Sequence, residues 1–363
     1  MKQYKFIISG GGTAGHINPA LSIADELLLR NPSCKILFVG SSNRMEMNLV
    51  PRHGYNISGL WISGYVRGKI IQNLLLPIKL KVSLIHSLLI ILLNRPNVVI
   101  GTGGFASGPI VFIASLLGIK TLIQEQNSYA GVTNRFLSKR VNKICVAYEN
   151  MNRFFDSNKI VFTGNPIRKK FINKKFCNLK SKNYFNLKDN KKTLLVLGGS
   201  NGSREINKLI LNNIEFFNFL QIQLIWQCGK IYFNKYKKLN NNNNIHVYDY
   251  INDMYEAYDA TDFIISRAGA SSISELSVVG KPVIFIPSPN VAEDHQKKNA
   301  QRLVDQNAAL LIEEDNLEND FKELFKSLLH NHKLQSNLSE NIKKFVKLNA
   351  TNDIVDEIEK MIK

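Results

Sequence analysis

Glycine-rich loops are the part of this chain whose residue types and spacing most directly suggest chemistry. GGGTAG at Gly10 and GGSNG at Gly198 each follow a short apolar run and precede a helical pattern. Glycine allows a tight turn there and lets a phosphate approach the N-terminus of the following helix. Because Gly10–Gly15 also fits GxGxxG, one interpretation is an NADP-dependent oxidoreductase in which Arg44 accepts the 2′-phosphate.

The order of apolar run, glycine loop and helical pattern occurs four times. The apolar runs begin at Tyr4, Asn97, Thr193 and Asp262. Strands that alternate with helices through short loops predict parallel sheets covered on both faces. We therefore expect an α/β fold of two Rossmann-like, doubly wound halves that face each other across a cleft. Ligands of such sheets bind at the carboxyl ends of the strands, where these loops lie.

The length of the chain supports two domains. A single hydrophobic core stops growing at about 250–300 residues, and this chain has 363. We expect one domain over residues 1–163 and a second over 164–340, and the final helical stretch, 341–363, could pack back on the first. With 44% apolar and 21% charged residues the chain is globular. Its four cysteines form no CxxC pair, which argues against a disulfide framework or a zinc site and fits a reducing cytoplasm.

The net charge of +18 suggests an anionic partner: nucleic acid, anionic lipid or a phosphorylated substrate. Compositional drift is the alternative, because lysine, asparagine and isoleucine are all abundant. No run of aromatic residues accompanies the basic ones, so the stacking platform of an RNA-binding protein is missing. We expect no nucleic-acid partner.

An apolar segment over Ile70–Leu93 carries a second signal. Its longest uncharged part is shorter than the roughly 20 residues that span a bilayer, so we expect no transmembrane helix. Its apolar residues follow helical spacing, which fits either a buried crossover helix or a surface that binds an anionic membrane. The stripe consists of Ile78, Val82, Ile85, Leu89 and Leu92, and the basic residues around it are Arg67, Lys69, Lys79, Lys81 and Arg95.

An ordered set of motifs resembles one known family. The motifs are GGTAGHINPALSIA at Gly11, GTGGFASGP at Gly101, EQNSYAGVTNRFLSK at Glu125, GNPIR at Gly164, GGSNGSREIN at Gly198, and SRAGASSISEL through DHQKKNA from Ser266. In this order, and over about Lys5 to Leu311, the chain resembles the MurG family of peptidoglycan N-acetylglucosaminyltransferases.

The resemblance implies both an activity and a place in the cell. The family has the two-Rossmann arrangement called GT-B. It moves N-acetylglucosamine from UDP-GlcNAc to the C4 hydroxyl of the muramoyl sugar of lipid I, with inversion, and so makes lipid II. The implied partners are UDP-GlcNAc, lipid I and the anionic cytoplasmic face of the bacterial cell membrane, where the protein would be peripheral. The first domain would face the acceptor and the membrane, and the second would bind the donor.

Carried over residue by residue, the resemblance also implies a donor site. The Glu275 carboxylate would accept hydrogen bonds from the ribose hydroxyls, although a glutamate in the first turn of a helix is also simply favourable there. The backbone of Ile251 would read uracil, and Gln296 would bind the sugar hydroxyls. The diphosphate would contact Ala270, Ser271, Ser272, Ser200 and Arg168. The first half would add Thr13, Ala14, Gly15 and Asn127 to the donor site. The acceptor and membrane side would consist of Gly103 and Gly104 with Arg67 and Lys69.

Two positions depart from the family pattern. Ala14 replaces the middle glycine of the usual TGG, which is tolerable if its φ is negative. Gln124 stands before EQN where the family commonly has histidine, which removes one titratable group. There is no DxD motif and no metal-ligand spacing of His and Cys, so we expect no metal and no cofactor.

His16 is the candidate for the catalytic base. Inverting transfer needs a base to take the proton from the attacking hydroxyl, and His16 follows the first glycine loop. The N-terminus of a helix disfavours imidazolium, which would leave the ring able to accept a proton. Glu125 is the alternative base. A third interpretation is that His16 only caps the helix or positions the acceptor.

Overall fold

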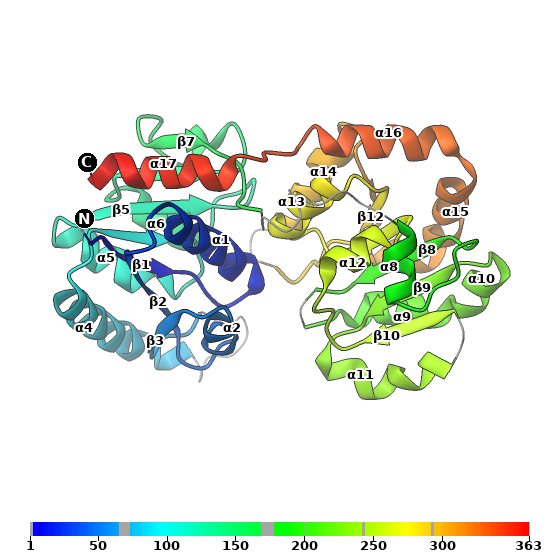
Figure 1. Ribbon diagram of the computed structural model, residues 1–363, viewed down its shortest axis with the longest axis horizontal. Coiled ribbons are helices and arrows are strands. Elements are labelled where there is room, and N and C mark those ends of the chain that lie inside the picture. The colour runs from blue at the N-terminus through cyan, green and yellow to red at the C-terminus, as the bar shows by residue number, and fades with distance from the viewer. Residues whose placement is uncertain are drawn as a thin grey trace. The chain divides into compact units, whose positions relative to one another are not determined.

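The computed structural model describes residues 3–64, 73–167, 178–199, 201–241, 244–291 and 294–362. The chain forms two compact units, of which the first is Met1–Arg168 with Lys347–Lys363 and the second is Lys169–Val346. Each unit is a parallel β-sheet with helices packed on it (Figure 1). The predicted α/β class with two Rossmann-like domains is therefore confirmed.

The first unit holds a seven-stranded sheet in the described part of the chain, in the order β3-β2-β1-β4-β5-β6-β7, and every neighbouring pair is parallel. The strands are β1 Lys5–Ser9, β2 Lys35–Ser41, β3 Asn56–Leu60, β4 Val98–Gly101, β5 Lys120–Glu125, β6 Lys143–Val146 and β7 Ile160–Phe162. The helices are α1 Ala14–Arg30, α2 Glu46–Arg52, α4 Leu76–Asn94, α5 Ser107–Leu116, α6 Val132–Ser138 and α17 Ala350–Ile362, with a short 3₁₀ turn over Met151–Arg153.

Alternation along the strands explains why both faces of this sheet are covered. Phe6 and Ile8 of β1 belong to a core shared with α1 and α17, whereas Ile7 belongs to a second core shared with α4 and α5. Successive side chains of a strand point to opposite faces, so a strand buried on both faces reads as a continuous apolar run. The last helix, α17, thus completes the first unit after the chain has formed the second.

The second unit repeats the plan with the order β10-β9-β8-β11-β12-β13, again all parallel. Its core centres on the buried rings of Trp226, Phe217, Phe321 and Phe325. The strands are β8 Thr193–Leu197, β9 Gln223–Gln227, β10 Ile245–Tyr248, β11 Phe263–Ser266, β12 Val283–Phe285 and β13 Leu310–Leu311. The helices are α8 Asn178–Tyr184, α9 Arg204–Asn212, α10 Ile214–Phe219, α11 Lys230–Tyr236, α12 Met254–Asp259, α13 Ala270–Val279, α14 His295–Val304, α15 Leu317–His330 and α16 His332–Lys343, with 3₁₀ turns over Lys237–Asn241 and Glu314–Asn316.

The four glycine loops form two pairs. In the first sheet β1 pairs with β4, and the loops that follow these two strands contain Gly10–Gly12 and Gly101–Gly104. In the second sheet β8 pairs with β11, and the loops that follow begin at Gly198 and Arg267. Each pair flanks the point where the order of strands reverses, which is where ligands bind in open α/β sheets.

Three helices begin earlier than the helical patterns of the sequence, which start at Pro19, Pro109 and Ile273. The helices themselves begin at Ala14 (α1), Ser107 (α5) and Ala270 (α13). Ala14, Gly15 and Ala270 therefore lie in first helical turns and not in the loops. Ala14 is not among the residues with positive φ, which is the condition under which a methyl group is tolerated there. Glu275 lies in the second turn of α13, because the helix starts five residues before it, so the expectation of a first-turn glutamate was wrong.

The apolar segment forms α4, a crossover helix that packs on the first sheet and on α5 (Figure 1). Its buried positions are Ser83, Ser87, Ile90 and Ile91. The predicted stripe instead faces outward, with Ile85 62%, Leu89 52% and Leu92 55% exposed. Of the described residues, α4 alone forms a helix whose length and composition would suffice to cross a membrane. The helix reaches this length because it extends back through Lys81 and Lys79 to Leu76, and its uncharged part, residues 82–94, remains shorter than the roughly 20 residues of a bilayer span.

Candidate functional site

The first glycine loop is held by a buried carboxylate, Glu46 at the start of α2. The backbone N–H of Gly12 donates to Glu46 Oε2 at 3.1 Å, and the N–H of Ser41 donates to Oε1 at 2.9 Å. Gly12 has φ +86°, and a Cβ at Gly11 would lie 2.7 Å from the Cδ of Glu46. Glycine is therefore required by both backbone angle and space. The sequence analysis missed Glu46, which follows the second strand in the run RME.

His16 lies in the first turn of α1, with its ring against the loop that follows β4. Its Nδ1 is 3.1 Å from the carbonyl oxygen of Thr102 and 3.1 Å from Oε1 of Gln126. Cβ atoms built at Gly103 and Gly104 would lie 2.9 Å from Nδ1 and 3.2 Å from Cδ2 of the ring. Both glycines have positive φ. The two predicted acceptor glycines therefore make the space in which the imidazole sits.

The hydrogen-bond pattern assigns the tautomer of His16. Nδ1 faces two acceptors, so it carries the hydrogen, and Nε2 is left with a lone pair. Gln126 presents its oxygen to the ring because its Nε2 donates to the carbonyl of Thr102 at 2.6 Å and to Oε1 of Gln124. In the described part of the chain Nε2 of His16 has no hydrogen-bond partner. This geometry suits a proton acceptor.

Glu125 is buried at the end of β5, and both of its carboxylate oxygens are engaged. Oε1 accepts from the backbone and side-chain amides of Asn127 at 3.0 and 3.2 Å. Oε2 accepts from the N–H of Gly131 at 3.0 Å and from Nδ2 of Asn134 at 2.9 Å. These bonds close the loop between β5 and α6. Glu125 is thus arranged as the structural centre of the EQN loop, and it places Asn127.

The first unit brings its predicted site residues together at one edge of the sheet. Thr13 caps α1 in an extended conformation, and its carbonyl accepts from the N–H of His16 at 3.1 Å. Ala14 and Gly15 follow in the first turn, and Asn127 follows β5. They all lie beyond the carboxyl ends of β1, β4 and β5.

In the second unit the predicted donor residues also gather beyond the carboxyl ends of the strands. Ala270, Ser271 and Ser272 form the first turn of α13 after β11. Glu275 is buried one turn further on, where the hydroxyl of Tyr258 donates to its Oε2 at 3.4 Å. Gln296 lies in the first turn of α14, and its Oε1 accepts from the N–H of Ser288 at 2.9 Å. That bond orients the Gln296 amide with its NH₂ group away from Ser288.

Ile251 is buried after β10, and its backbone N–H is already engaged. It donates to Oε1 of Gln227 at 2.9 Å, and Nε2 of Gln227 donates to the carbonyl of Gly199 at 3.1 Å. Gln227 therefore links the predicted uracil-reading residue to the glycine loop after β8. To read uracil through its N–H, Ile251 would have to exchange this bond for one to the base.

Arg267, the first residue after β11, is a further contact at this edge that the sequence analysis did not single out. Its guanidinium donates to the carbonyl of Ile286 at 2.9 Å and to the hydroxyl of Ser203, and it forms an ion pair with Glu314. Ser203 caps α9, where its hydroxyl accepts from the N–H of Ile206. Arg267 thus fastens the loops after β8, β12 and β13 to one another.

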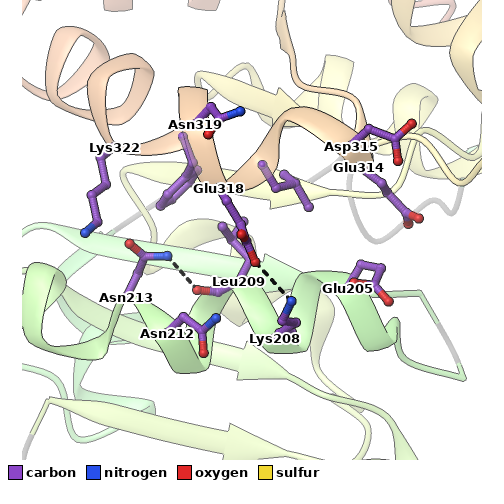
Figure 2. Close-up of a pocket in the computed structure, with 12 residues that line it drawn as sticks. Glu205, Lys208, Leu209, Asn212, Asn213, Glu314, Asp315, Glu318, Asn319 and Lys322 are labelled. Carbon is purple, nitrogen blue, oxygen red and sulfur yellow. Dashed lines mark hydrogen bonds and ion pairs between the residues drawn. The ribbon is translucent and has the colours of Figure 1, made fainter.

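A separate pocket of about 420 Å³ lies between α9 and α15 of the second unit (Figure 2). Carboxylates line it, and one of its two lysines, Lys208, forms an ion pair with Glu318 at 3.0 Å. Of its lining residues, Glu314 connects it to the donor edge through Arg267. None of the predicted donor residues that the structure describes lines this pocket, so the strand edges and not this pocket define the candidate site.

The described cysteines do not contribute reactive thiols. Cys34, Cys145 and Cys228 are free and buried. Cys228 lies beside the loop at Gly202, and burial raises the pKa of its thiol to about 11. It stays protonated at neutral pH and is a poor nucleophile.

Some predictions lie outside the described residues. These are Arg168 and Ser200 of the donor site and Arg67 and Lys69 of the acceptor and membrane side.

Comparison with known proteins decides the family. Residues 6–146 match the glycosyltransferase family 28 N-terminal domain, and residues 193–358 match its C-terminal domain. The UDP-N-acetylglucosamine--N-acetylmuramyl-(pentapeptide) pyrophosphoryl-undecaprenol N-acetylglucosamine transferase of Flavobacterium psychrophilum is 54% identical over 362 residues, which cover 100% of this chain and 99% of that protein. The protein of the same name from Christiangramia forsetii is 52% identical, over 99% of this chain and 98% of its own. A crystal structure of Acinetobacter baumannii MurG matches with a TM-score of 0.76 at 28% identity, over 99% of this chain and 100% of that one. The chain belongs to the MurG family of glycosyltransferases.

Membership of the MurG family agrees with the motifs from which it was expected. The NADP-dependent oxidoreductase receives no support from these comparisons. Arg44, which that interpretation needs for a 2′-phosphate, has its guanidinium carbon 5.8 Å from the centre of the Phe105 ring.

Proposed function

We propose that this enzyme transfers N-acetylglucosamine from UDP-GlcNAc to the C4 hydroxyl of the muramoyl sugar of lipid I, with inversion, and so makes lipid II for peptidoglycan. The names of the relatives support the donor sugar and the undecaprenol-linked acceptor. The observation that carries the proposal is the His16 ring, which leaves Nε2 as an acceptor beside the paired loops of the first unit.

His16 is the proposed general base. Nε2 takes the proton from the C4 hydroxyl as its oxygen attacks the anomeric carbon and UDP departs from the opposite side. Nδ1–H remains bonded to Gln126 and Thr102, so the ring keeps its orientation while positive charge develops on it. The same arrangement holds a base in place in other acid–base sites.

Glu125 has a positioning role in this proposal. Four hydrogen bonds occupy its carboxylate, about as many as its two oxygens can accept, whereas Nε2 of His16 has no partner in the described part of the chain. Its function is to hold Asn127 and the loop before α6.

The second unit supplies the donor site. The first turn of α13, with Ala270, Ser271 and Ser272, faces the diphosphate with backbone N–H groups and the positive end of the helix dipole. Glu275 accepts from the ribose hydroxyls, and Gln296 donates to the sugar. Arg168 and Ser200 complete the phosphate contacts.

The enzyme works at the cytoplasmic face of the cell membrane as a peripheral protein. The exposed apolar stripe of α4 supports this, because contiguous apolar surface of this kind marks an interaction site. Lys79 and Lys81 lie on the same helix, and the charge of +18 favours an anionic surface.

Thermal unfolding with candidate ligands tests the donor assignment. UDP-GlcNAc at about 100 times its Kd should stabilise the fold by about 2.7 kcal/mol, and NADPH should not. Transfer of labelled N-acetylglucosamine to a lipid I analogue, with the anomeric configuration of the product determined by NMR, tests the reaction. Stabilisation by NADPH alone, or a product with retained configuration, would overturn the proposal.

A further inference from the structure

Three buried side-chain amides form a chain that ends on His16. Nε2 of Gln124 donates to Oδ1 of Asn165 at 3.0 Å, Nε2 of Gln126 donates to Oε1 of Gln124, and Oε1 of Gln126 lies 3.1 Å from Nδ1 of His16. Asn165 comes from the GNPIR motif after β7, and Gln124 comes from β5. We propose that Gln124 is a positioning residue that fixes, through Gln126, the orientation and the tautomer of the His16 ring.

The direction of the chain is set at its far end. Nδ2 of Asn165 donates to the backbone carbonyl of Gln126 at 3.1 Å, so its oxygen is what faces Gln124. Gln124 must then offer its NH₂ group, because a reversed amide would place oxygen against oxygen. Its own oxygen is thereby turned toward Gln126.

The same logic carries the direction to the histidine. The NH₂ group of Gln126 has two hydrogens. Its acceptors are the carbonyl of Thr102 at 2.6 Å, Oε1 of Gln124 and, at 3.3 Å, the backbone carbonyl of Gln124. Both amide hydrogens are used, so Oε1 of Gln126 faces the ring and Nδ1 must carry the hydrogen. The lone pair then lies on Nε2, the nitrogen that the proposed base needs.

The position of Gln124 calls for a side chain that donates and accepts at once. Gln124 is fully buried, so an unmatched group there would be costly. Leucine can do neither, and an ionised glutamate can only accept, which leaves Oδ1 of Asn165 facing an oxygen. Histidine can do both through its two ring nitrogens. A series of three variants therefore separates the transmission of hydrogen-bond direction to His16 (the relay) from the simple filling of space: Gln124→Leu, Gln124→Glu and Gln124→His.

The test combines kinetics with ¹⁵N NMR of the full-length protein labelled at histidine. The ring-nitrogen signals distinguish a protonated from an unprotonated nitrogen, and loss of one set in His16→Ala assigns those of His16. We expect protonated Nδ1 in the native protein. In Gln124→Leu the Gln126 amide loses an acceptor and can turn its NH₂ group toward Nδ1, in competition with the carbonyl of Thr102, so we expect a mixture of tautomers. The kcat of Gln124→Leu should fall by roughly 10- to 100-fold, the range seen when a partner that orients a metal-binding histidine is removed, and the KM for UDP-GlcNAc should change little. Gln124→Glu, whose carboxylate still accepts from Gln126, should lose stability at Asn165 but keep the native tautomer, and Gln124→His should keep most of the activity as well.

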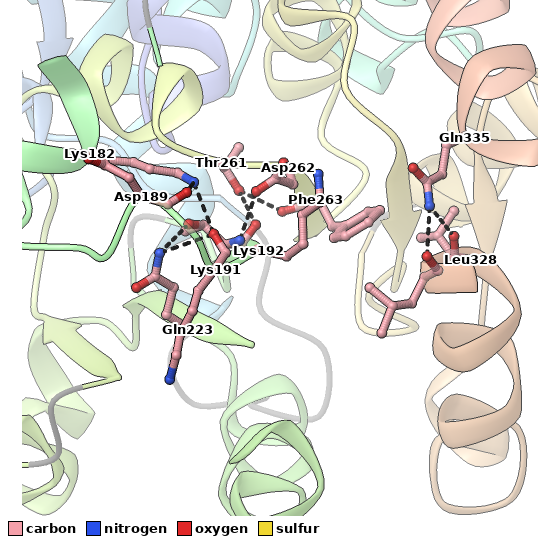
Figure 3. Close-up of polar contacts among 12 residues, drawn as sticks. Lys182, Asp189, Lys191, Lys192, Gln223, Thr261, Asp262, Phe263, Leu328 and Gln335 are labelled. Carbon is pink, nitrogen blue, oxygen red and sulfur yellow. Dashed lines mark hydrogen bonds and ion pairs between the residues drawn. The ribbon is translucent and has the colours of Figure 1, made fainter. Parts of the chain in front are cut away.

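A second buried glutamine provides the matched control. Gln223 of β9 is fully buried (Figure 3). Its amide donates to the carbonyl of Lys188 at 2.8 Å and to the hydroxyl of Thr193 at 3.0 Å. Gln223→Leu should lower the unfolding temperature, as Gln124→Leu does, without changing the His16 signals or the kcat of the folded enzyme. If Gln124→Leu does not fold, Gln124→Met, whose side chain has no oxygen to accept from Gln126, takes its place.

The expected effect on kcat rests on the proposed role of His16 as the base, whereas the expected tautomer of the His16 ring does not depend on that role. Native His16 signals and native kcat in folded Gln124→Leu or Gln124→Met would overturn the relay. Losses of the native tautomer in Gln124→Glu and Gln124→His equal to that in Gln124→Leu would also overturn it. A normal kcat in His16→Ala would instead overturn the proposed base and leave the NMR result to report on the relay alone.

Discussion

The carboxylate of Glu46 accepts a hydrogen bond from the backbone N–H of Gly12 at 3.1 Å and so holds the first glycine loop in place. Its other oxygen accepts from the N–H of Ser41 at the end of β2. One fully buried side chain thus joins two strand ends that are neighbours in the sheet. The loop that leads into His16 depends on a residue that does not face the ligand edge itself.

Replacing Glu46 by glutamine should destabilise the protein. An amide has one oxygen, so its NH₂ group would be forced against the N–H of either Gly12 or Ser41. We expect the free energy of unfolding to fall by about 1–3 kcal/mol, the cost of a buried donor left unsatisfied. Urea unfolding of Glu46→Gln measures this, with the exposed Glu318→Gln as the control that should unfold like the native protein. A native unfolding midpoint for Glu46→Gln would show that the carboxylate does not hold the loop.

The glycine loops could be predicted because their signal is local. A strand, a glycine run and a helix start are adjacent in sequence, as at Thr193–Leu197 and Gly198, and the family motifs fall on the same junctions. The pairing of the loops depends on strand order instead, since β1 lies beside β4 and β8 beside β11. Nothing within one motif shows that order.

The residues that the sequence did not show act through distant contacts. Glu46 is 34 positions from Gly12, Gln126 is 110 positions from His16, and Arg267 is 64 positions from Ser203. Gln126 stood within a recognised motif, but its role is visible only once the loop after β5 is placed beside α1. The sequence could not show whether the apolar stripe of α4 is buried or exposed, for a related reason. Helical spacing shows that a face is apolar, and only packing shows whether that face is covered.

Removing the imidazole of His16 should slow catalysis without weakening the binding of the donor. If Nε2 is the base, His16→Ala lowers kcat by about 10²–10⁴, and the Kd for UDP-GlcNAc, whose proposed contacts are mainly in the second unit, changes little. Steady-state kinetics with a lipid I analogue, together with calorimetric titration of the donor, measure the two effects separately.

Glu125→Ala is the comparison that separates the two candidate bases. Removing the Glu125 carboxylate takes away the oxygens that accept from the amides of Asn127, Gly131 and Asn134. We therefore expect a lower unfolding temperature together with reduced activity. If Glu125→Ala keeps native stability but is inactive, and His16→Ala is active, the base is Glu125. If both variants stay active, neither residue is the base.

Glu275→Ala should weaken donor binding. A buried carboxylate that accepts hydrogen bonds from ribose hydroxyls contributes about 1–3 kcal/mol, as is usual for hydrogen bonds to charged groups. Tyr258→Phe is the matched control, because it removes only the hydroxyl that reaches Glu275 at 3.4 Å, and it should change the donor Kd much less. Unchanged donor affinity in folded Glu275→Ala would remove this residue from the nucleotide site.

The last prediction concerns α4 and the membrane. Ile85 and Leu89 are exposed by 62% and 52% on a helix that also carries Lys79 and Lys81. An apolar side chain that enters a bilayer contributes roughly 1.5 kcal/mol or more, about tenfold in partition. Ile85→Ser and Leu89→Ser together should therefore lower binding to vesicles of anionic phospholipid by well over tenfold. Sedimentation of the protein with vesicles measures this.

Salt and a matched leucine separate the charged and apolar contributions to that binding. The Debye length falls from about 10 Å at 0.1 M to about 3 Å at 1 M salt, so much of the native protein should be released at high salt. Leu29, which is 66% exposed on α1, belongs to the opposite face of the first sheet, where its neighbour Leu27 joins the other core. Leu29→Ser should bind vesicles like the native protein, because only the α4 face is proposed to meet the lipid. Equal binding to neutral and anionic vesicles would exclude a role for the lysines, and equal losses for the α4 and Leu29 variants would exclude α4 as the membrane-binding face.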